Sequence, residues 1–486
     1  MKIWLSIVVI ALVPAICVAS GLPRSTPEQQ GVSSSDVLAF VEALDQVDAM
    51  NSVMVVRHGH VIAEGWWTPY RASARHSLYS LSKSFTSTAV GFAIAEGKLS
   101  VNDSVLSFFP EDAPVDPSSN LKAMRVSDLL RMSTGHQREP GRAGSEPWTK
   151  IFLAQEVPFR PGTHFLYNTS GTYMQSAIVQ KVTGQTTLDY LRPRLFEPLG
   201  IEEPVWETSP QGISLGGYGL SVRTEDIAKF GQLYLQKGMW QGKQLLPAAW
   251  IEAATARQTS NGSNPDSDWE QGYGYQFWRC RHGVYRGDGA FGQYCIVMDD
   301  HDTVVAITSG VKNMPAVLQL VWDKLLPALK SNELPAANQA HQQLADKLQN
   351  VSVRLPDGGD KPGALLGKTF TFPANQQNLE SLTIESGPGD RQVTLVTRVA
   401  GSEQRLVCSY GQWHDGHAAW GSMPRQVASA AAGWTNDRFN ARVCFYETPF
   451  ITTLRIEPSG DEITLNAETN VGFTQTKLPE LVGKAR

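Results

Sequence analysis

The spacing of apolar and polar residues places strands near both ends of the first part of the chain and helices between them. Residues 52–67 alternate with a period of two around a polar turn at 57–60, which predicts a β-hairpin. The same period returns over 273–307, where glycines separate the expected strands. The pattern over 315–329 predicts a closing amphipathic helix. Strands at both ends with helices between them indicate an α/β or α+β domain whose terminal strands share one sheet.

The longest helical pattern covers residues 81–97. Its apolar residues recur at three- and four-residue steps, Leu81, Phe85 and Phe92 among them, and Gly97 is a natural helix end. Because apolar residues occupy most of its sides, we expect this helix to be buried. Further helices are expected over 126–132, 171–183, 187–195, 224–237 and 247–256.

A change of pattern marks a second domain. Residues 331–362 hold a polar, helix-like stretch over 336–350 and then turns rich in proline and glycine, and beyond them the helical signal nearly vanishes. Short strands are expected over 379–385, 392–399, 403–409, 441–446, 451–457 and 462–466. The sequence therefore predicts a first domain over 21–330, a linker over 331–362, and a β-rich accessory domain over 363–486, built as a sandwich or a barrel.

Residues 1–20 have the pattern of a cleaved signal peptide. Lys2 precedes an apolar run over 3–13, and the small residues within 17–19 resemble a signal-peptidase site. A membrane anchor is the alternative, but the run is interrupted by Pro14 and is shorter than the ~20 residues that a spanning helix needs. A lipidated Cys17 is a second alternative. We expect an exported protein, periplasmic or secreted, with no stable membrane span after cleavage.

Four cysteines remain once that segment is removed: Cys280, Cys295, Cys408 and Cys444. An exported protein can keep such an even set oxidised, and three pairings are possible. We expect Cys280 to pair with Cys295 and Cys408 with Cys444, because each pair falls inside one predicted domain. The alternative is four buried free thiols. Zinc is disfavoured because the sequence has no Cys-x-x-Cys spacing.

Composition and charge exclude several classes of protein. The 486 residues include 42 Lys and Arg against 47 Asp and Glu, a net charge of −5 without long runs of either sign. Hydrophobic residues make up 42% of the chain, which excludes a disordered protein. Binding of nucleic acid needs clustered cations, and none are found here. We therefore expect no nucleic-acid partner.

The sequence carries no recognised cofactor motif. A phosphate-binding loop, a dinucleotide-binding fingerprint and a His-Glu-x-x-His helix are all absent. His58 and His60 lie in the expected hairpin turn without a third ligand at suitable spacing. His414 and His417 fit a solvated turn better than a metal site. We expect neither cofactor nor metal, and the search narrows to hydrolysis by a nucleophilic side chain.

Two serines compete for the role of nucleophile. Ser214 lies in the sequence Gly-Ile-Ser-Leu-Gly, which matches the pattern of a nucleophile elbow. That elbow needs a strand that leads directly into a helix. Residues 204–211 form a poor strand, and glycines within 216–219 stand where the helix would begin. The Ser214 hypothesis is therefore disfavoured.

Ser80 stands at the start of the buried helix, and Lys83 follows one turn later on the same face. A buried ammonium is costly unless it is paired or neutralised, so a lysine at this place is unusual. Two other Ser-x-x-Lys pairs, which begin at Ser119 and Ser309, lie in a loop and at the end of a strand. The alternative for Ser80 and Lys83 is a capping serine and a lysine whose ammonium reaches solvent.

Five segments in family order resemble the serine β-lactamase and penicillin-recognising superfamily, particularly its class C-like branch of esterases, D-amino peptidases and 6-aminohexanoate-dimer hydrolases. The segments are 80–83, 97–103, 126–135, 161–167 and 219–230. The resemblance covers about residues 30–330. It implies a serine β-lactamase-like fold, in which an antiparallel sheet is flanked by helices and accompanied by an all-helical subregion.

The resemblance also implies roles for three side chains. Ser80 would attack a carbonyl and form an acyl-enzyme, which water then releases. Lys83 would act as base if burial lowers its pKa towards neutrality. Tyr167 would either relay the proton to the leaving group or act as the base itself, and the sequence leaves these two assignments open.

An oxyanion hole is the remaining part that the resemblance implies. Its donors would be the backbone N–H of Ser80 and one from the strand near Ala290. Gly287 and Gly289 fit this picture because a substrate that approaches the backbone closely favours residues without Cβ. Glycines in a bulged strand are the alternative.

Two departures from the family pattern bear on the substrate. The family's Tyr-x-Asn is Tyr167-Asn168-Thr169 here, and its Lys-Thr-Gly is replaced by residues 287–289, Gly-Asp-Gly. The lysine that would bind a substrate carboxylate is therefore absent. Arg286 is a possible substitute, and a surface strand arginine is the alternative. These losses favour an esterase or amidase over a dedicated β-lactamase.

Two hypotheses for function follow. The first is an exported serine hydrolase that cleaves a small-molecule ester or amide through Ser80, Lys83 and Tyr167. The second is a catalytically weak protein that binds the cell wall or peptidoglycan and uses its β-rich region as the binding module. The presence of all three side chains favours the enzyme.

Overall fold

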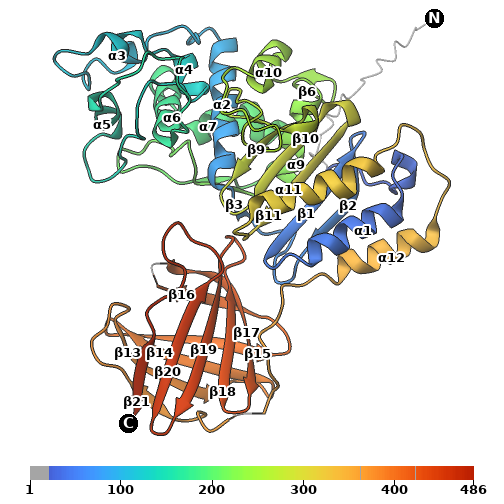
Figure 1. The fold of residues 1–486 in the computed structure, drawn as a ribbon, viewed down its shortest axis with the longest axis vertical. Coiled ribbons are helices and arrows are strands. Elements are labelled where there is room, and N and C mark those ends of the chain that lie inside the picture. The colour runs from blue at the N-terminus through green and yellow to red at the C-terminus, as the bar shows by residue number, and fades with distance from the viewer. Residues whose placement is uncertain (1–20, 362, 422) are drawn as a thin grey trace, which may run out of the picture.

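The computed structural model describes residues 21–361, 363–421 and 423–486. The predicted signal segment, 1–20, lies outside the described residues. Across these three ranges, no helix is both long and apolar enough to cross a membrane. The chain forms an N-terminal domain of sheet and helices and a C-terminal β-barrel below it (Figure 1).

One six-stranded sheet forms the centre of the N-terminal domain. Its strands are β1 (Met50–Arg57), β2 (His60–Trp66), β8 (Trp278–Arg279), β9 (Tyr285–Gly289), β10 (Gln293–Met298) and β11 (Thr303–Ser309). They lie in the order β2-β1-β11-β10-β9-β8, and every neighbouring pair is antiparallel. Val53 of β1 lies opposite Ile307 of β11, so the first and last strands of the domain are neighbours, as the periodicity predicted.

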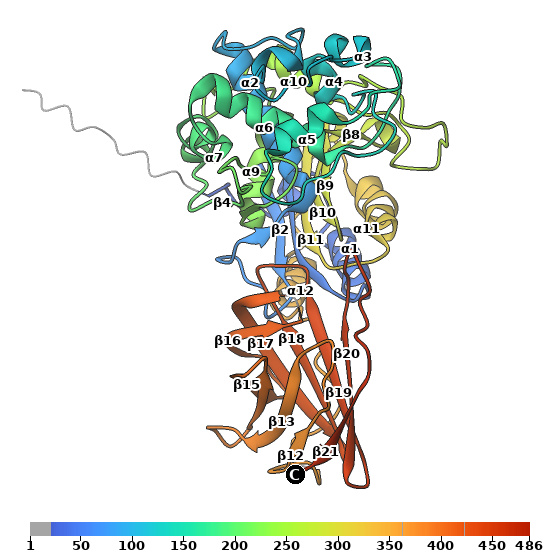
Figure 2. The same cartoon turned by 90° about the vertical axis from the view of Figure 1, so that its left-hand side faces the viewer.

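Successive residues of a strand point to opposite faces, and each face of this sheet has its own core. Met54 and Val56 join a core that includes Phe230 of α9 (Thr224–Leu235). Val53 and Val55 join a second core with α1 (Ser34–Asp45) and α11 (Met314–Leu320). Figure 2 shows α9 and α1 on opposite sides of the sheet. The sheet flanked by helices confirms the predicted fold class.

A helical region lies next to strand β9, near one edge of the sheet. Its helices are α2 (Ser82–Ala95), α3 (Ser119–Ala123), α4 (Val126–Leu130), α5 (Trp148–Ala154), α6 (Thr169–Thr183), α7 (Thr187–Leu191), α8 (Glu197–Leu199) and α10 (Ala248–Thr255). Short strands β3 (His76–Ser77), β4 (Val205–Trp206) and β5 (Leu220–Val222) form a small sheet, and β6 (Met239–Trp240) and β7 (Lys243–Gln244) form a hairpin.

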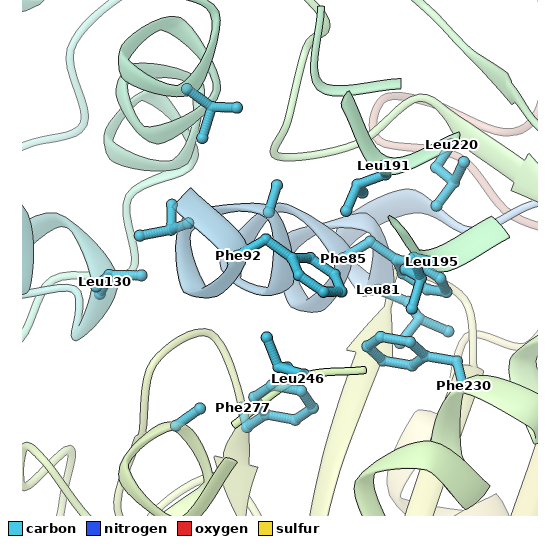
Figure 3. Packing of buried hydrophobic residues seen from close by; sticks show 14 of the residues in the cluster. Leu81, Phe85, Phe92, Leu130, Leu191, Leu195, Leu220, Phe230, Leu246 and Phe277 are labelled. Carbon is cyan, nitrogen blue, oxygen red and sulfur yellow. The ribbon is translucent and has the colours of Figure 1, made fainter. Parts of the chain in front are cut away.

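Helix α2 lies at the centre of this region and is buried along most of its length. Its Phe85 stacks on Phe230 with ring centroids 3.9 Å apart. Figure 3 shows Leu81, Phe85 and Phe92 of α2 among apolar side chains from several other segments. Apolar contact on many sides fixes the position of the helix and of the turn that precedes it.

Part of the segment predicted as a linker packs against the N-terminal domain. Helix α12 (Asn338–Gln349), within the expected 336–350 stretch, lies beside α1 and β2. Leu344 is buried in the second core, and Lys347 donates to Asp45 of α1 over 2.5 Å. This helix is therefore part of the outer layer of the N-terminal domain.

The described residues of the C-terminal domain form ten strands: β12 (Thr369–Thr371), β13 (Leu379–Ser386), β14 (Gln392–Val399), β15 (Ser402–Tyr410), β16 (His414–Trp420), β17 (Met423–Thr435), β18 (Arg438–Cys444), β19 (Ile451–Ser459), β20 (Glu462–Thr469) and β21 (Leu481–Ala485). Pairing of β15 with β17 brings the two ends of the sheet together, which makes a barrel and not a sandwich. His414 and His417 lie in strand β16, so the turn predicted for them is wrong.

The four cysteines that the structure describes are buried free thiols, so the predicted disulfides are wrong. Cys280 and Cys295 belong to the cores on opposite faces of the central sheet. Cys408 lies in the core of the barrel, whereas Cys444 lies in the second core of the N-terminal domain. Each expected pair therefore divides between two cores, which the even number of cysteines does not reveal.

Truncation of Phe85 to alanine should destabilise the N-terminal domain by about 3–5 kcal/mol, because it leaves a cavity in a core that cannot collapse fully. Urea unfolding followed by tryptophan fluorescence measures this loss. Val115→Ala is the matched control, since Val115 is fully exposed, and should change the free energy of unfolding by less than about 0.5 kcal/mol. Equal effects of the two variants would contradict the central position of α2.

The free thiols give a second expectation. Denatured, unreduced protein that lacks residues 1–20 should react with four equivalents of a thiol reagent, one at each cysteine of the described chain. The folded protein should react far more slowly, because all four side chains are buried. Two equivalents or none after denaturation would show that disulfides form.

Candidate active site

Ser80 lies in a 3₁₀ turn, η2 (Tyr79–Leu81), that leads directly into α2. Leu78 and Leu81 on either side of it are fully buried, and the Leu78 N–H donates to the carbonyl of Leu220 over 2.8 Å. Ser80 itself is only half-buried. Two apolar anchors thus hold the turn, and the hydroxyl between them stays accessible. The predicted place of Ser80 at the start of a buried helix is confirmed.

Lys83 lies on the first turn of α2 and is 1% exposed. Its Nζ is 3.2 Å from Ser80 Oγ and 3.3 Å from Thr169 Oγ1, and it donates to the Gly217 carbonyl over 2.7 Å. All three partners are uncharged oxygens. Within the described ranges Lys83 forms no ion pair. Because the side chain is buried, the alternative of an ammonium that reaches solvent is wrong.

Burial lowers the pKa of Lys83 from its ordinary value to about 7. The cost of removing a charge from water is the largest cause, and the nearby guanidinium of Arg142 acts in the same direction. The carboxylates of Glu139 and Asp288 oppose it. A large fraction of the amine is therefore neutral near pH 7.

Tyr167 lies just before α6, and its ring forms a wall of the site. The ring stacks on Trp278 at 5.3 Å between centroids, and Lys83 Nζ is 4.9 Å from its centre. Burial and the Asp288 carboxylate raise the pKa of the phenol, and the adjacent Ser80 hydroxyl offsets part of this rise. The phenol therefore keeps its proton at neutral pH. The structure brings Ser80, Lys83 and Tyr167 together, as the resemblance implied.

The two residues after Tyr167 have separate tasks. Asn168 is buried, and its side chain accepts from the Gly171 N–H over 2.9 Å, so it caps α6. Thr169, in place of the family's asparagine, lies against Lys83. The departure from the family pattern therefore puts a hydroxyl beside the amine.

Glu139 and Arg142 come from a loop in which the sequence predicts no site residue. The Glu139 carboxylate accepts the N–H groups of Thr169 and Ser170 over 2.9 and 3.2 Å, where α6 begins. Arg142 pairs with Glu139 and donates to Ser170 Oγ over 2.8 Å. An anion at a helix N-terminus is stabilising. Neither residue has a local sequence signal, because their partner is a helix end 27 or more residues away.

Strand β9 packs tightly against the turn that carries Ser80, and this explains two glycines. A Cβ at Gly287 would come within 2.4 Å of Leu81, and one at Gly289 within 2.0 Å of the Leu78 carbonyl. Helix and strand approach each other too closely for any side chain there. The glycines are thus needed for packing, a reason different from the predicted approach of a substrate. Ala290 follows directly and is half-buried.

Arg286 and Asp288 form a buried ion pair on β9. Arg286 is 0% exposed, and its guanidinium contacts the Asp288 carboxylate at 2.8 Å and the Cys280 sulfur at 2.9 Å. It also lies over the Trp269 ring at 4.4 Å. The interpretation as a surface arginine is wrong. Arg286 cannot replace the missing lysine as a partner for a substrate carboxylate either, because its guanidinium is buried and already paired.

Ser214 does not sit on a nucleophile elbow. It is fully buried in a loop, and the next helix, α9, begins only at Thr224. Its neighbours instead cover the site, since the Gly217 carbonyl accepts from Lys83 and the Gly216 carbonyl from Thr86. The elbow hypothesis is wrong, and the glycines that follow Ser214 supply acceptors for α2.

Comparison with known proteins agrees with the five segments. The beta-lactamase family model matches residues 41–324, more than half of the chain. The chain is 26% identical over 278 residues to a 6-aminohexanoate-dimer hydrolase of Paenarthrobacter ureafaciens, which covers 52% of this chain and 71% of the relative.

Two solved structures show a similar fold. A penicillin-binding protein homologue from Caulobacter crescentus aligns with a TM-score of 0.50 and 17% identity, over 58% of this chain and 95% of its own. SurE aligns with a TM-score of 0.50 and 17% identity, over 93% of this chain and 99% of its own. Because the family model matches more than half of its length, the chain belongs to the beta-lactamase family of serine hydrolases, within the penicillin-recognising superfamily.

Proposed function

We propose that the protein is an exported serine hydrolase that cleaves ester or amide bonds through an acyl-enzyme on Ser80. The observation that carries this proposal is the 3.2 Å contact between Ser80 Oγ and the buried Lys83 Nζ, whose pKa lies near 7. A serine hydroxyl is a weak nucleophile unless a base removes its proton. A neutral amine in hydrogen-bonding distance supplies that base.

The reaction begins when Lys83 takes the Ser80 proton and Oγ bonds to the substrate carbonyl carbon. The carbonyl oxygen becomes negatively charged, and the backbone N–H groups of Ser80 and Ala290 are the donors that we assign to it. Collapse of this intermediate breaks the bond to the leaving group, which takes up a proton. Water then attacks the acyl-enzyme in the same way and releases the acid.

Tyr167 is assigned as the proton relay and not as the base. A base must lose its proton near the working pH, and the raised pKa of this phenol opposes that. Its ring lies beside both Ser80 and Lys83. The phenol can therefore give its proton to the leaving group and recover one from Lys83.

The charges around the site favour substrates without a carboxylate. Arg286 is buried against Asp288, and Arg142 is paired with Glu139. Apart from Lys83 itself, both of these cations near Ser80 therefore already have a carboxylate partner. A β-lactam or a peptide C-terminus would bring a carboxylate with no partner, at a cost in binding. We therefore propose a neutral small-molecule ester or amide, and no nucleic-acid partner.

Covalent labelling tests the nucleophile directly. A fluorophosphonate should form one adduct, mapped by mass spectrometry to Ser80, and Ser80→Ala should lower kcat/KM for a short p-nitrophenyl ester by at least about 10³-fold. Ser214→Ala is the matched control and should keep activity within about twofold, because its buried Oγ makes no hydrogen bond in the described structure. An adduct at Ser214 would sink the proposal, and no adduct at all would favour the cell-wall-binding alternative.

The pH profile tests Lys83. Only the neutral amine can accept a proton, so kcat/KM should rise as the pH increases through about 7 and then level off. Arg142→Gln removes a positive charge that lowers the Lys83 pKa, so the rise should move to higher pH. The control Arg405→Gln, on an exposed barrel strand, should leave it in place. Lys83→Arg should be nearly inactive because a guanidinium stays protonated. A flat profile between about pH 6 and 8 would rule out Lys83 as the base.

A further inference from the structure

Four aromatic rings from both domains meet beside the turn that carries Ser80. Tyr79 and Phe291 come from the N-terminal domain, and Phe450 and Phe473 from loops of the barrel. Phe473 lies 4.9 Å from Phe291 and 5.7 Å from Tyr79 between ring centroids. Phe450 lies 6.0 Å from Phe291 and 6.4 Å from Tyr79. We call these four residues the aromatic cluster.

The cluster touches both parts of the proposed catalytic site. Tyr79 directly precedes Ser80, and Phe291 directly follows Ala290. Both have left-handed backbone conformations, with φ of 49° and 70°. Such conformations are costly for residues with a Cβ, and they are found preferentially at functional sites. Their rings pack edge to face at 5.3 Å, so the nucleophile turn and the end of β9 share one aromatic contact.

Hydrogen bonds hold the two barrel loops against the N-terminal domain. In the loop between β18 and β19, the Glu447 carbonyl accepts from the Ser77 N–H over 2.9 Å, and the Thr448 carbonyl accepts from the Tyr70 hydroxyl over 3.1 Å. In the loop between β20 and β21, Asn470 Nδ2 donates to the Gly310 carbonyl over 2.8 Å. These loops lie at the end of the barrel that faces the N-terminal domain (Figures 1 and 2).

Phe473 is 74% exposed although it contacts two other rings of the cluster. Tyr79, Phe291 and Phe450 are half-buried. The cluster therefore presents an open apolar surface beside Ser80, with the ring from the barrel as its most exposed member. Exposed apolar area of this kind gains free energy when an apolar group covers it.

We infer that the barrel completes the substrate site, and that Phe473 binds an apolar alkyl or aryl part of the substrate next to Ser80. This inference rests on the proposed function and adds the substrate class: esters or amides with an apolar chain and no carboxylate. It makes Phe473 a specificity-determining residue. The accessory domain then contributes the Phe473 ring to the substrate site of the N-terminal domain, and is not a separate binding module.

The test compares substrates of two lengths on full-length wild type and Phe473→Ala. In the acyl series, kcat/KM is measured for p-nitrophenyl acetate and octanoate; in the leaving-group series, for ethyl and octyl acetate. Phe473→Ala should lower kcat/KM about tenfold for the longer substrate of one series and less than about twofold for its short partner. The series that responds shows whether the acyl group or the leaving group covers Phe473.

Three controls keep the inference separate from the proposed function. Val482→Ala removes an exposed apolar side chain elsewhere on the barrel and should leave the length preference unchanged. Phe473→Leu should restore most of the preference for the longer substrate that Phe473→Ala loses. A misfolded loop would not permit this recovery. Labelling rates with methyl and octyl fluorophosphonates give the same comparison without turnover. If neither series nor the labelling rates respond to Phe473→Ala, while Ser80→Ala is inactive, the inference fails and the proposed function stands.

Discussion

The burial of one amine is the constraint on which the rest of the site depends. Lys83 is almost completely buried. It has no carboxylate partner in the described part of the chain and donates only to uncharged oxygens. A buried lysine in this position relieves its desolvation cost by losing its proton. An ion pair would have fixed the charge and removed the base. The lack of a counter-ion makes the charged lysine costly for stability. For the same reason the amine can lose its proton and act as a base.

Several features of the fold maintain that condition. Helix α2 is buried along most of its length, and Lys83 is buried with it. The loop that carries Gly217 covers the amine and offers a carbonyl in place of water. Glycine at 287 and 289 lets β9 lie directly on the helix start. Each of these is a packing feature, and together they define the dielectric environment of one nitrogen.

Local patterns predicted the parts that local interactions determine. The hairpin of β1 and β2, helix α2 and the Ser80–Lys83 contact all follow from spacing along a single element. Helix α1 is not among the predicted helices, although Val37, Phe40, Val41 and Leu44 have helical spacing. Strand β17 is not among the predicted strands. Its alanines favour helix over strand, and its pairing with β16 and β18 makes it a strand.

Contacts between distant segments were the parts that could not be predicted. The even number of cysteines suggested disulfides. The face of the sheet on which each thiol lies depends on the register of its strand, which the number of cysteines does not reveal. The burial of Arg286 likewise depends on Trp269 and Cys280, which lie outside β9 and contact the guanidinium only in the folded domain. The barrel loops have no sequence signal for their place beside Ser80, because their partner rings lie more than 150 residues earlier in the chain.

The pairing of charges around Lys83 affects both the pKa of this base and the charge of the substrate that we propose. An unpaired anion near Lys83 would raise its pKa and keep it protonated, and an unpaired cation would attract substrate carboxylates. Here Arg142 is paired with Glu139 and Arg286 with Asp288, so each charge near the amine has its opposite beside it. A site with this balance has little electrostatic means to select a charged substrate. Selection must then come from shape and apolar contact, and the aromatic cluster is the surface beside Ser80 that can supply it.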